Sequence, residues 1–285
     1  MRVLFIGGGN MAQAILAGLI AQKYSPAGLS VVEPLQETRA AIASLGVKPF
    51  ATFTHDLLDC DAIVLAVKPQ MMRDAISPLA GTLTTQLVIS IAAGVGTESL
   101  AVTLGTGAAP YGNIVRAMPN TPALIRAGIT GLFAAPGVDD AGKQTAEKLL
   151  GSVGKTVWFA NETMLDAVTA VSGSGPAYVF YFIEALEQAA LELGFEPESA
   201  RLFATQTFLG GAQLAASTGE SPGALRARVT SRRGTTERAI ESFDAHALKQ
   251  HFIAGVKAAC ARSRELGREV GANSTEPTGF ARGTD

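Results

Sequence analysis

Cysteine and histidine are scarce in this chain of 285 residues. The two cysteines, Cys60 and Cys260, are far apart and form no Cys-x-x-Cys pair, so neither a disulfide framework nor a structural zinc site is predicted. Buried, reduced thiols of this kind favour a cytoplasmic location. The three histidines are His55, His246 and His251, and their spacing places no two on one helix face, so we expect no metal site.

Charge and long hydrophobic runs are also limited. Charged residues make up 17% of the chain and the net charge is −2, so no basic face for nucleic acid is expected. No stretch approaches the roughly 20 apolar residues that span a bilayer. The apolar run Val3–Ile6 is too short for the core of a signal peptide. With 47% hydrophobic residues, the length instead suits two packed domains with neither membrane nor nucleic-acid partners.

The first 160 residues alternate strand-like and helix-like segments. Ala62–Val67 is continuously apolar, which is typical of a central parallel strand buried on both faces. Met11–Ala21 and Gln36–Leu45 carry helical patterns. This alternation predicts an α/β domain with a doubly wound parallel sheet. The expected strands are Arg2–Ile6, Leu29–Val32, Ala62–Val67, Leu87–Ile91, Asn113–Met118, Thr130–Ala134 and Lys155–Phe159.

The pattern changes at Asn161, after which helical periodicity dominates. We therefore expect a nucleotide-binding domain over residues 1–160, an all-helical domain over 161–267 and a disordered tail over 268–285. The segment Ala177–Leu193 begins apolar on every side, which predicts a helix that is buried all round. A helical domain of this size cannot easily cover such a helix, so a subunit interface is expected to do so.

The segment Gly7–Ala12 fits the pattern Gly-x-Gly-x-x-Ala between a strand and a helix. This context predicts a Rossmann-like dinucleotide site. Gly7 would permit the tight turn, Gly9 would let the backbone approach the pyrophosphate, and Ala12 would allow close helix packing. The alternative is a glycine turn that binds nothing.

Glu33 ends the second expected strand. An acidic residue about 20 residues beyond the glycines commonly binds the ribose 2′-hydroxyl and repels a 2′-phosphate, which favours NADH over NADPH. Alternatively, Glu33 points into solvent, and the nearby Arg39 accommodates a phosphate.

Hydroxyl residues surround Gly234 just before a helical stretch that starts near Glu237. Thr230, Ser231, Thr235 and Thr236 would add donors to the N–H groups of a helix start, which suits a small carboxylate. An ordinary N-cap explains the segment equally well. The same two interpretations apply to the turns Gly173–Tyr178 and Arg116–Pro122, and Lys68 is either a ligand contact or a solvated strand end.

Taken together, these motifs resemble the pyrroline-5-carboxylate reductase family over about residues 1–266. The matching segments, in chain order, are Gly7–Ala12, Ala66–Pro69, Ala92–Gly94, Met118–Pro122, Gly173–Tyr178 and Thr230–Thr236. The resemblance implies reduction of L-Δ1-pyrroline-5-carboxylate to L-proline with NADPH or NADH. It also implies a homodimer at least, or a decamer, built by the helical domain.

The resemblance also assigns residues. Gly234, Thr235 and Thr236 would hold the substrate carboxylate, with Ser231 beside them and Thr236 near the ring nitrogen, which makes Thr236 and Ser231 the catalytic candidates. Asn120 and Ser174 complete the expected substrate contacts. The expected cofactor contacts are Ile6, Gly7, Gly9, Asn10, Met11, Ala12, Glu33, Ala66, Val67, Lys68, Pro69, Ala93 and Gly94.

One departure from the family lies in the hydroxyl turn, where Arg232 and Arg233 replace the usual Pro-Gly of Thr-Ser-Pro-Gly-Gly-Thr-Thr. If that glycine needs a positive φ, Arg233 costs on the order of 1 kcal/mol or more. The alternatives are a backbone region open to any residue, or extra positive charge that favours an anionic substrate.

The sequence lacks lysine between Lys155 and Lys249, and no histidine falls in the motifs. A β-hydroxyacid dehydrogenase, which uses a lysine on the long helix as its acid, is therefore disfavoured. A cyclic imine protonates easily, so hydride transfer to it needs no strong protein acid, and catalysis would depend on positioning and fixed donors. A non-catalytic dinucleotide-binding regulator and a reductase of a related cyclic imine remain as alternatives.

Overall fold

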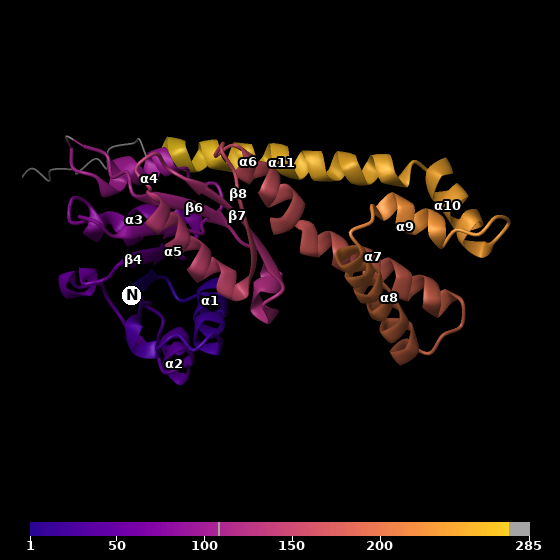
Figure 1. Cartoon of the computed structure of the whole chain (residues 1–285), viewed down its shortest axis with the longest axis horizontal. Helices are drawn as coiled ribbons and strands as arrows, with labels where there is room; N and C mark the ends of the chain where they lie inside the picture. Colours follow the sequence, from indigo (N-terminus) through magenta and orange to yellow (C-terminus); the bar gives the residue numbers. More distant parts are fainter. Residues whose placement is uncertain (108, 274–285) are drawn as a thin grey trace, which may run out of the picture. The chain divides into compact units, whose positions relative to one another are not determined.

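The computed structural model describes residues 1–107 and 109–273, which form two compact units (Figure 1). Unit 1 comprises Met1–Gly173 and the segment that begins at Ala259, and unit 2 comprises Ser174–Ala258. The helix α11 (Leu248–Asn273) therefore begins in unit 2 and ends in unit 1.

Unit 1 is built on one eight-stranded sheet in the order β3-β2-β1-β4-β5-β6-β7-β8. Neighbouring strands run parallel except for the antiparallel pair β6 and β7. The doubly wound α/β fold expected from the sequence is thus confirmed, with one strand pair of opposite direction. The strands are β1 (Val3–Ile6), β2 (Leu29–Val32), β3 (Lys48–Phe50), β4 (Ala62–Leu65), β5 (Leu87–Ser90), β6 (Ile114–Met118), β7 (Gly128–Ala134) and β8 (Gly154–Trp158).

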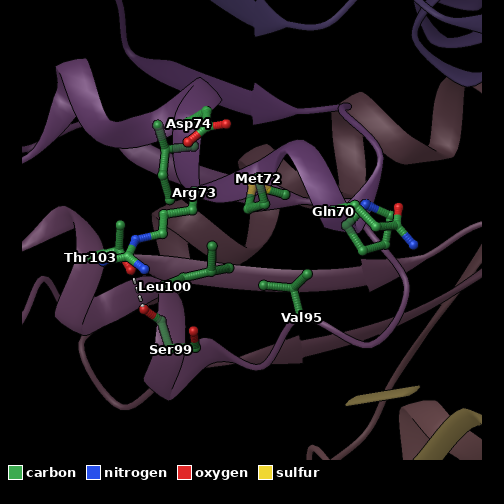
Figure 2. Close-up of a pocket in the computed structure, with 10 residues that line it drawn as sticks. Gln70, Met72, Arg73, Asp74, Val95, Ser99, Leu100 and Thr103 are labelled. Carbon is green, nitrogen blue, oxygen red and sulfur yellow. Dashed lines mark hydrogen bonds between the residues drawn. The ribbon is translucent and has the colours of Figure 1, made fainter. Parts of the chain in front are cut away.

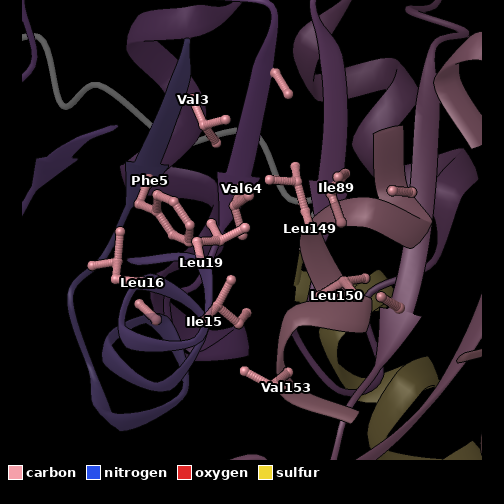
Figure 3. Packing of buried hydrophobic residues seen from close by; sticks show 14 of the residues in the cluster. Val3, Phe5, Ile15, Leu16, Leu19, Val64, Ile89, Leu149, Leu150 and Val153 are labelled. Carbon is pink, nitrogen blue, oxygen red and sulfur yellow. The ribbon is translucent and has the colours of Figure 1, made fainter. Parts of the chain in front are cut away.

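Helices cover both faces of this sheet, which is why its central strands are apolar on both sides. All four residues of β4 are fully buried. In β1, Val3 and Phe5 face a core formed with α1, α2 and α5, shown in Figure 3. The alternate residues Leu4 and Ile6 face a second core formed with α3 and α4. These helices are α1 (Asn10–Ala21), α2 (Gln36–Ser44), α3 (Met72–Ile76), α4 (Thr97–Leu104) and α5 (Asp140–Leu150).

A further helical segment, α6 (Met164–Val168), packs on the sheet and belongs to unit 1. Leu165 is fully buried, and a Cβ built on Gly131 of β7 would lie 2.9 Å from Val168 Cγ1. Because this segment and the π-helix η7 (Thr169–Gly173) stay with the sheet, the division between the units falls after Gly173, later than the boundary expected at Asn161.

Unit 2 is entirely helical in its described residues, as the periodicity predicted. Its helices α7 and α8 pack on each other, but α7 has no buried residue within this chain. Phe180 and Tyr181 of α7 are 65% and 68% exposed, and Phe203 of α8 is 61% exposed. The helices are α7 (Gly175–Glu192), α8 (Pro197–Thr218), α9 (Pro222–Arg228), α10 (Thr235–Ala245) and the first part of α11.

The helix α11 continues to Asn273. The helix thus includes residues 268–273, where the sequence predicted the start of a disordered tail, and the rest of that tail lies outside the described residues. Short 3-10 segments complete the chain: η1 (Pro26–Gly28), η2 (His55–Leu58), η3 (Pro69–Met71), η4 (Ser77–Leu79), η5 (Thr121–Ile125) and η6 (Gly151–Val153).

Candidate active site

The glycine turn after β1 lies beside the carboxyl ends of the neighbouring strands β2 and β4. Gly7 has a φ of 97°, and a Cβ there would lie 2.7 Å from Ala66 O, so only glycine fits. The Gly7 N–H donates to Val32 O at 2.9 Å, and the Ala66 N–H donates to Ile6 O at 2.8 Å. The turn is therefore fixed to β2 on one side and to the segment after β4 on the other.

The helix α1 starts at Asn10, directly after Gly9, and its first N–H groups have no partner inside the helix. Gly9 provides no side-chain cap, and a Cβ on Gly9 would meet no atom within 4 Å. Ala12 is 1% exposed and packs into the core. An open helix N-terminus of this kind, at the carboxyl end of a parallel sheet, is the geometry that binds phosphate groups.

Glu33 does not point into solvent. Its side chain is buried, and its two carboxylate oxygens accept hydrogen bonds from the Gly8 and Leu35 N–H groups, each at 2.9 Å. The Arg39 guanidinium donates to Glu33 O at 2.9 Å and to Pro34 O at 2.6 Å. Glu33 thus holds the glycine turn against the end of β2, a role that the sequence pattern did not reveal.

The other expected cofactor motifs lie at the carboxyl ends of the neighbouring strands. Ala66–Pro69 follows β4, and Ala93 and Gly94 follow β5, where the Ile91 N–H donates to Leu65 O at 3.1 Å. Lys68 and Ala93 are exposed, and Gly94 has a φ of 76°. The ends of β1, β4 and β5 thus carry these motifs along the same edge of the sheet, where parallel α/β sheets bind their ligands.

A cavity of about 210 Å³ lies between the segment Pro69–Ile76 and α4, shown in Figure 2. Met72, Val95 and Leu100 form apolar walls, and Arg73 reaches across it from α3. Pro69 is its one lining residue that the sequence had assigned to the cofactor site. The cavity therefore borders the motif turns without containing them.

Asn120 bonds within unit 1. Its carboxamide nitrogen donates to Ser172 O at 3.2 Å, and its carboxamide oxygen accepts from the Ile129 N–H at 2.9 Å. The side chain is buried and connects the start of β7 to η7. The structure thus gives Asn120 a structural role, and its expected contact with substrate stays a prediction.

An ion pair that the sequence reasoning missed lies beside the Gly94 segment. The Arg116 Nη1 atom of β6 is 3.1 Å from Glu162 Oε1, and the Arg116 side chain is 9% exposed. Glu162 also accepts from the Thr97 N–H at 2.8 Å and from the Thr97 hydroxyl at 2.7 Å. Glu162 therefore fixes the start of α4, the helix that follows the Gly94 segment.

In unit 2, the hydroxyl turn forms the start of α10. A Cβ on Gly234 would lie 2.4 Å from Ser231 Oγ and 3.0 Å from Ser231 O, so a side chain there would make the Ser231 hydroxyl turn away. Thr235 and Thr236 are the first helical residues, and helix geometry leaves their N–H groups without intrahelical partners. The structure thus brings Ser231, Gly234, Thr235 and Thr236 together, while Ser174 directly precedes α7.

Arg233 adopts a φ of 60°, the left-handed region that favours glycine. Its N–H donates to Glu237 Oε2 at 2.5 Å. The turn therefore retains a glycine-like backbone at the position where the chain departs from the family motif.

Comparisons with known proteins agree over nearly the whole chain. The family model for pyrroline-5-carboxylate reductase dimerisation matches residues 162–266, and the model described as NADP oxidoreductase coenzyme F420-dependent matches residues 2–94. A pyrroline-5-carboxylate reductase of Pseudomonas aeruginosa is 43% identical over 272 residues, which cover 95% of this chain and 98% of that protein. The chain belongs to the pyrroline-5-carboxylate reductase family.

Solved structures of the family are also similar. A pyrroline-5-carboxylate reductase from Coxiella burnetii matches with a TM-score of 0.86 and 42% identity, over 93% of this chain and 98% of that one. The Plasmodium falciparum pyrroline carboxylate reductase with NADP bound matches with a TM-score of 0.81 and 27% identity, over 94% of this chain and 98% of that one. The family and fold predicted from the motifs are thereby confirmed.

Proposed function

We propose that this chain reduces L-Δ1-pyrroline-5-carboxylate to L-proline by hydride transfer from NADPH or NADH, the last step of proline biosynthesis. Its membership in the pyrroline-5-carboxylate reductase family over most of its length carries the proposal. The open glycine turn before α1 and the hydroxyl turn before α10 supply the two kinds of anion site that such a reaction needs.

We assign the dinucleotide to unit 1. The first turn of α1 would hold the pyrophosphate, with N–H groups of Asn10, Met11 and Ala12 as donors. The remaining contacts would come from Ile6, Gly7 and Gly9 after β1, Ala66–Pro69 after β4, and Ala93 and Gly94 after β5. When bound, the dinucleotide supplies the hydride.

Preference for NADH, expected from Glu33, stays a prediction. Both carboxylate oxygens already accept N–H groups of the protein, although each retains a lone pair that a ribose hydroxyl could use. NADP is bound in the Plasmodium falciparum relative, so a 2′-phosphate is compatible with the family fold.

We assign the substrate carboxylate to the turn before α10. The N–H groups and hydroxyls of Thr235 and Thr236 point to an anion cradle, with Ser231 beside Gly234. Asn120 and Ser174 are the further contacts that we propose. Thr236 would hydrogen-bond the ring nitrogen, directly or through water, so that the protein orients an imine that is already protonated.

The Thr236→Val variant tests this assignment, with Thr236→Ser as its matched control because serine keeps the hydroxyl. Purified wild-type protein is first assayed for oxidation of NADPH and of NADH on addition of L-Δ1-pyrroline-5-carboxylate, with proline identified as product. Thr236→Val is expected to lose about 100-fold or more in kcat/KM with unchanged dinucleotide affinity, and Thr236→Ser to retain most activity. Equal rates for Thr236→Val and wild type would refute the role.

The same assay separates the alternatives. Dinucleotide binding without turnover would identify a regulatory protein, and faster reduction of a six-membered cyclic imine would identify a related reductase. One methylene group is worth only about 1–3 kcal/mol of discrimination, so both imines belong in the assay.

The assembly that we propose is a homodimer at least. The family match to a dimerisation model and the exposed apolar side chains of α7 and α8 support it. Sedimentation equilibrium distinguishes a dimer from the decamer that the family resemblance implies. No helix in the described ranges is long and apolar enough to cross a membrane. We propose a cytoplasmic location on the two unpaired thiols.

A further inference from the structure

The segment after β5 lies close to the last part of α11. A Cβ built on Gly94 would lie 3.4 Å from Gly267 N, and a Cβ built on Gly267 would lie 3.3 Å from Gly94 O. Two glycines far apart in the sequence thus face each other with no side chain between them.

A hydrogen bond fixes this part of α11 on unit 1. The Ser263 hydroxyl donates to Asp166 Oδ1 of α6 at 2.9 Å, and Ser263 is 5% exposed. Ser263 precedes Gly267 by four residues, so both lie on one face of α11. Since α6 is itself packed on β7 through Leu165, the position of Gly267 relative to the sheet is set by buried contacts.

The Gly94 segment is constrained at its ends as well. The Ile91 N–H donates to Leu65 O at 3.1 Å, and Glu162 accepts the N–H and hydroxyl of Thr97. Between these anchors, Gly94 has a φ of 76°, a conformation that few other residues would hold. A side chain at position 267 would therefore press on Gly94 O, in the middle of this constrained segment.

We propose that Gly267 is a positioning residue, which sets the place of the Gly94 backbone and through it that of the bound dinucleotide. This inference rests on the proposed function, because Gly94 is one of the cofactor contacts assigned there. A glycine at this position of α11 is otherwise unfavourable, since glycine weakens a helix interior. The close approach to Gly94 gives the physical reason for it.

The test compares Gly267→Ala with Gly255→Ala, a matched control in the same helix. A Cβ on Gly255 would meet no atom within 4 Å, whereas a Cβ on Gly267 would need Gly94 O to give by a few tenths of an ångström. Both substitutions add the same helix propensity, so differences between them report on the contact with Gly94. The melting temperature and the sedimentation mass of each full-length variant show that the fold and assembly are kept.

For Gly267→Ala we expect kcat to fall about tenfold or more, because misplacement of the reacting groups costs rate. The primary deuterium isotope effect with reduced dinucleotide labelled at C4 should rise as hydride transfer becomes rate-limiting. The KM for L-Δ1-pyrroline-5-carboxylate should change less than kcat, and Gly255→Ala should match wild type in all three quantities. If the isotope effect and kcat of Gly267→Ala match those of Gly255→Ala within twofold, the proposal is overturned.

Calorimetric titration of NADPH makes the outcome independent of turnover. If wild type binds NADPH but does not reduce the imine, the proposed function fails, while a weakened NADPH affinity of Gly267→Ala relative to Gly255→Ala still supports the positioning role. Equal NADPH affinities of the two variants in an inactive protein would overturn it. A third variant, Ser263→Ala, should lower the NADPH affinity by less than Gly267→Ala does, because it removes the hydrogen bond that joins α11 to Asp166.

Discussion

Replacement of Glu33 separates a structural role from a role in cofactor choice. The structure shows the carboxylate accepting the buried Gly8 N–H and the Leu35 N–H. In Glu33→Gln the side-chain shape is kept, but one of the two N–H groups would face an amide NH₂ instead of an oxygen. We therefore expect loss of one charge-assisted hydrogen bond and weakening of the other.

The size of the effect follows from burial. A hydrogen bond to a charged group contributes about 1.5–3 kcal/mol, and the neutral amide avoids the desolvation cost of the carboxylate. The Leu35 side chain is 65% exposed, so water can reach the neighbourhood of its N–H, whereas the Gly8 bond is buried. A net loss of about 2 kcal/mol in the free energy of unfolding of unit 1 is expected.

Urea unfolding followed by the fluorescence of Trp158, the single tryptophan, measures this loss, since Trp158 lies in β8 of unit 1. Glu37→Gln, at an exposed position in the first turn of α2, is the matched control and should change stability by less than about 1 kcal/mol. Glu33→Gln should loosen the glycine turn, which we assign to the pyrophosphate that NADH and NADPH share. The Kd values for NADH and NADPH should therefore rise together in this variant.

A different pattern would refute this reasoning. An unchanged urea midpoint together with a tenfold or larger shift of preference from NADH toward NADPH would mean that Glu33 acts on the ribose and not on the glycine turn. The expected result, a lower urea midpoint with a constant ratio of the two Kd values, would instead support the structural role and mean that other residues decide cofactor preference.

Two further predictions concern Arg233 and Cys60. Arg233→Gly should raise the free energy of unfolding of unit 2 by about 1 kcal/mol in urea unfolding followed by circular dichroism, because the φ of 60° favours glycine. At Arg232 φ is not positive, so Arg232→Gly should lower the free energy of unfolding. Equal effects of Arg232→Gly and Arg233→Gly would contradict the argument. Burial and then the Asp61 carboxylate raise the pKa of the Cys60 thiol to about 11, so in a Cys260→Ser background its alkylation by iodoacetamide at pH 8 should be at least about 100-fold slower than that of free cysteine. The fold favours the neutral Cys60 thiol, so the contribution of this thiol to the free energy of unfolding is present below about pH 8.5 and is lost as the pH rises toward 11. An alkylation rate that levels off before pH 9 would contradict the raised pKa.

The sequence predicted most of the sheet because its central strands are apolar and bounded by turns. It missed β3, which has only the residues Lys48–Phe50, lies at the sheet edge and contains a proline. It also missed that β7 runs antiparallel to β6, because periodicity reports which face a residue occupies and not the direction of the strand. The continuation of α6 with the sheet depends on the buried Leu165, a tertiary contact that local composition does not reveal.

In the candidate site, too, the sequence predicted residues that a local motif marks and missed residues that act through contacts distant in the sequence. Gly7 could be identified because a motif and a required backbone geometry coincide: its φ is positive and a Cβ there would meet Ala66 O. Gly234 was identified from its motif, and its φ of −88° is open to other residues. Glu33 was identified for a ribose contact, which stays a prediction, while its hydrogen bonds to Gly8 and Leu35 were not foreseen, since sequence spacing does not show where a carboxylate points. Glu162 and Gly267 were not identified at all, because each meets its partner across a large sequence separation.

The residues proposed for the cofactor would contact it mainly through backbone groups, so the most informative substitutions lie at the residues that support this backbone. A backbone N–H at Asn10 or Met11 is present whatever the side chain, so replacing these side chains leaves the donor in place. The placement of that backbone, in contrast, depends on side chains or their absence at supporting positions. Glu33 fixes Gly8 by a hydrogen bond, and the missing side chain of Gly267 leaves room for Gly94 O. Substitutions at Glu33 and Gly267 should therefore perturb dinucleotide binding more than substitutions at Asn10 or Met11, although neither supporting residue needs to touch the cofactor.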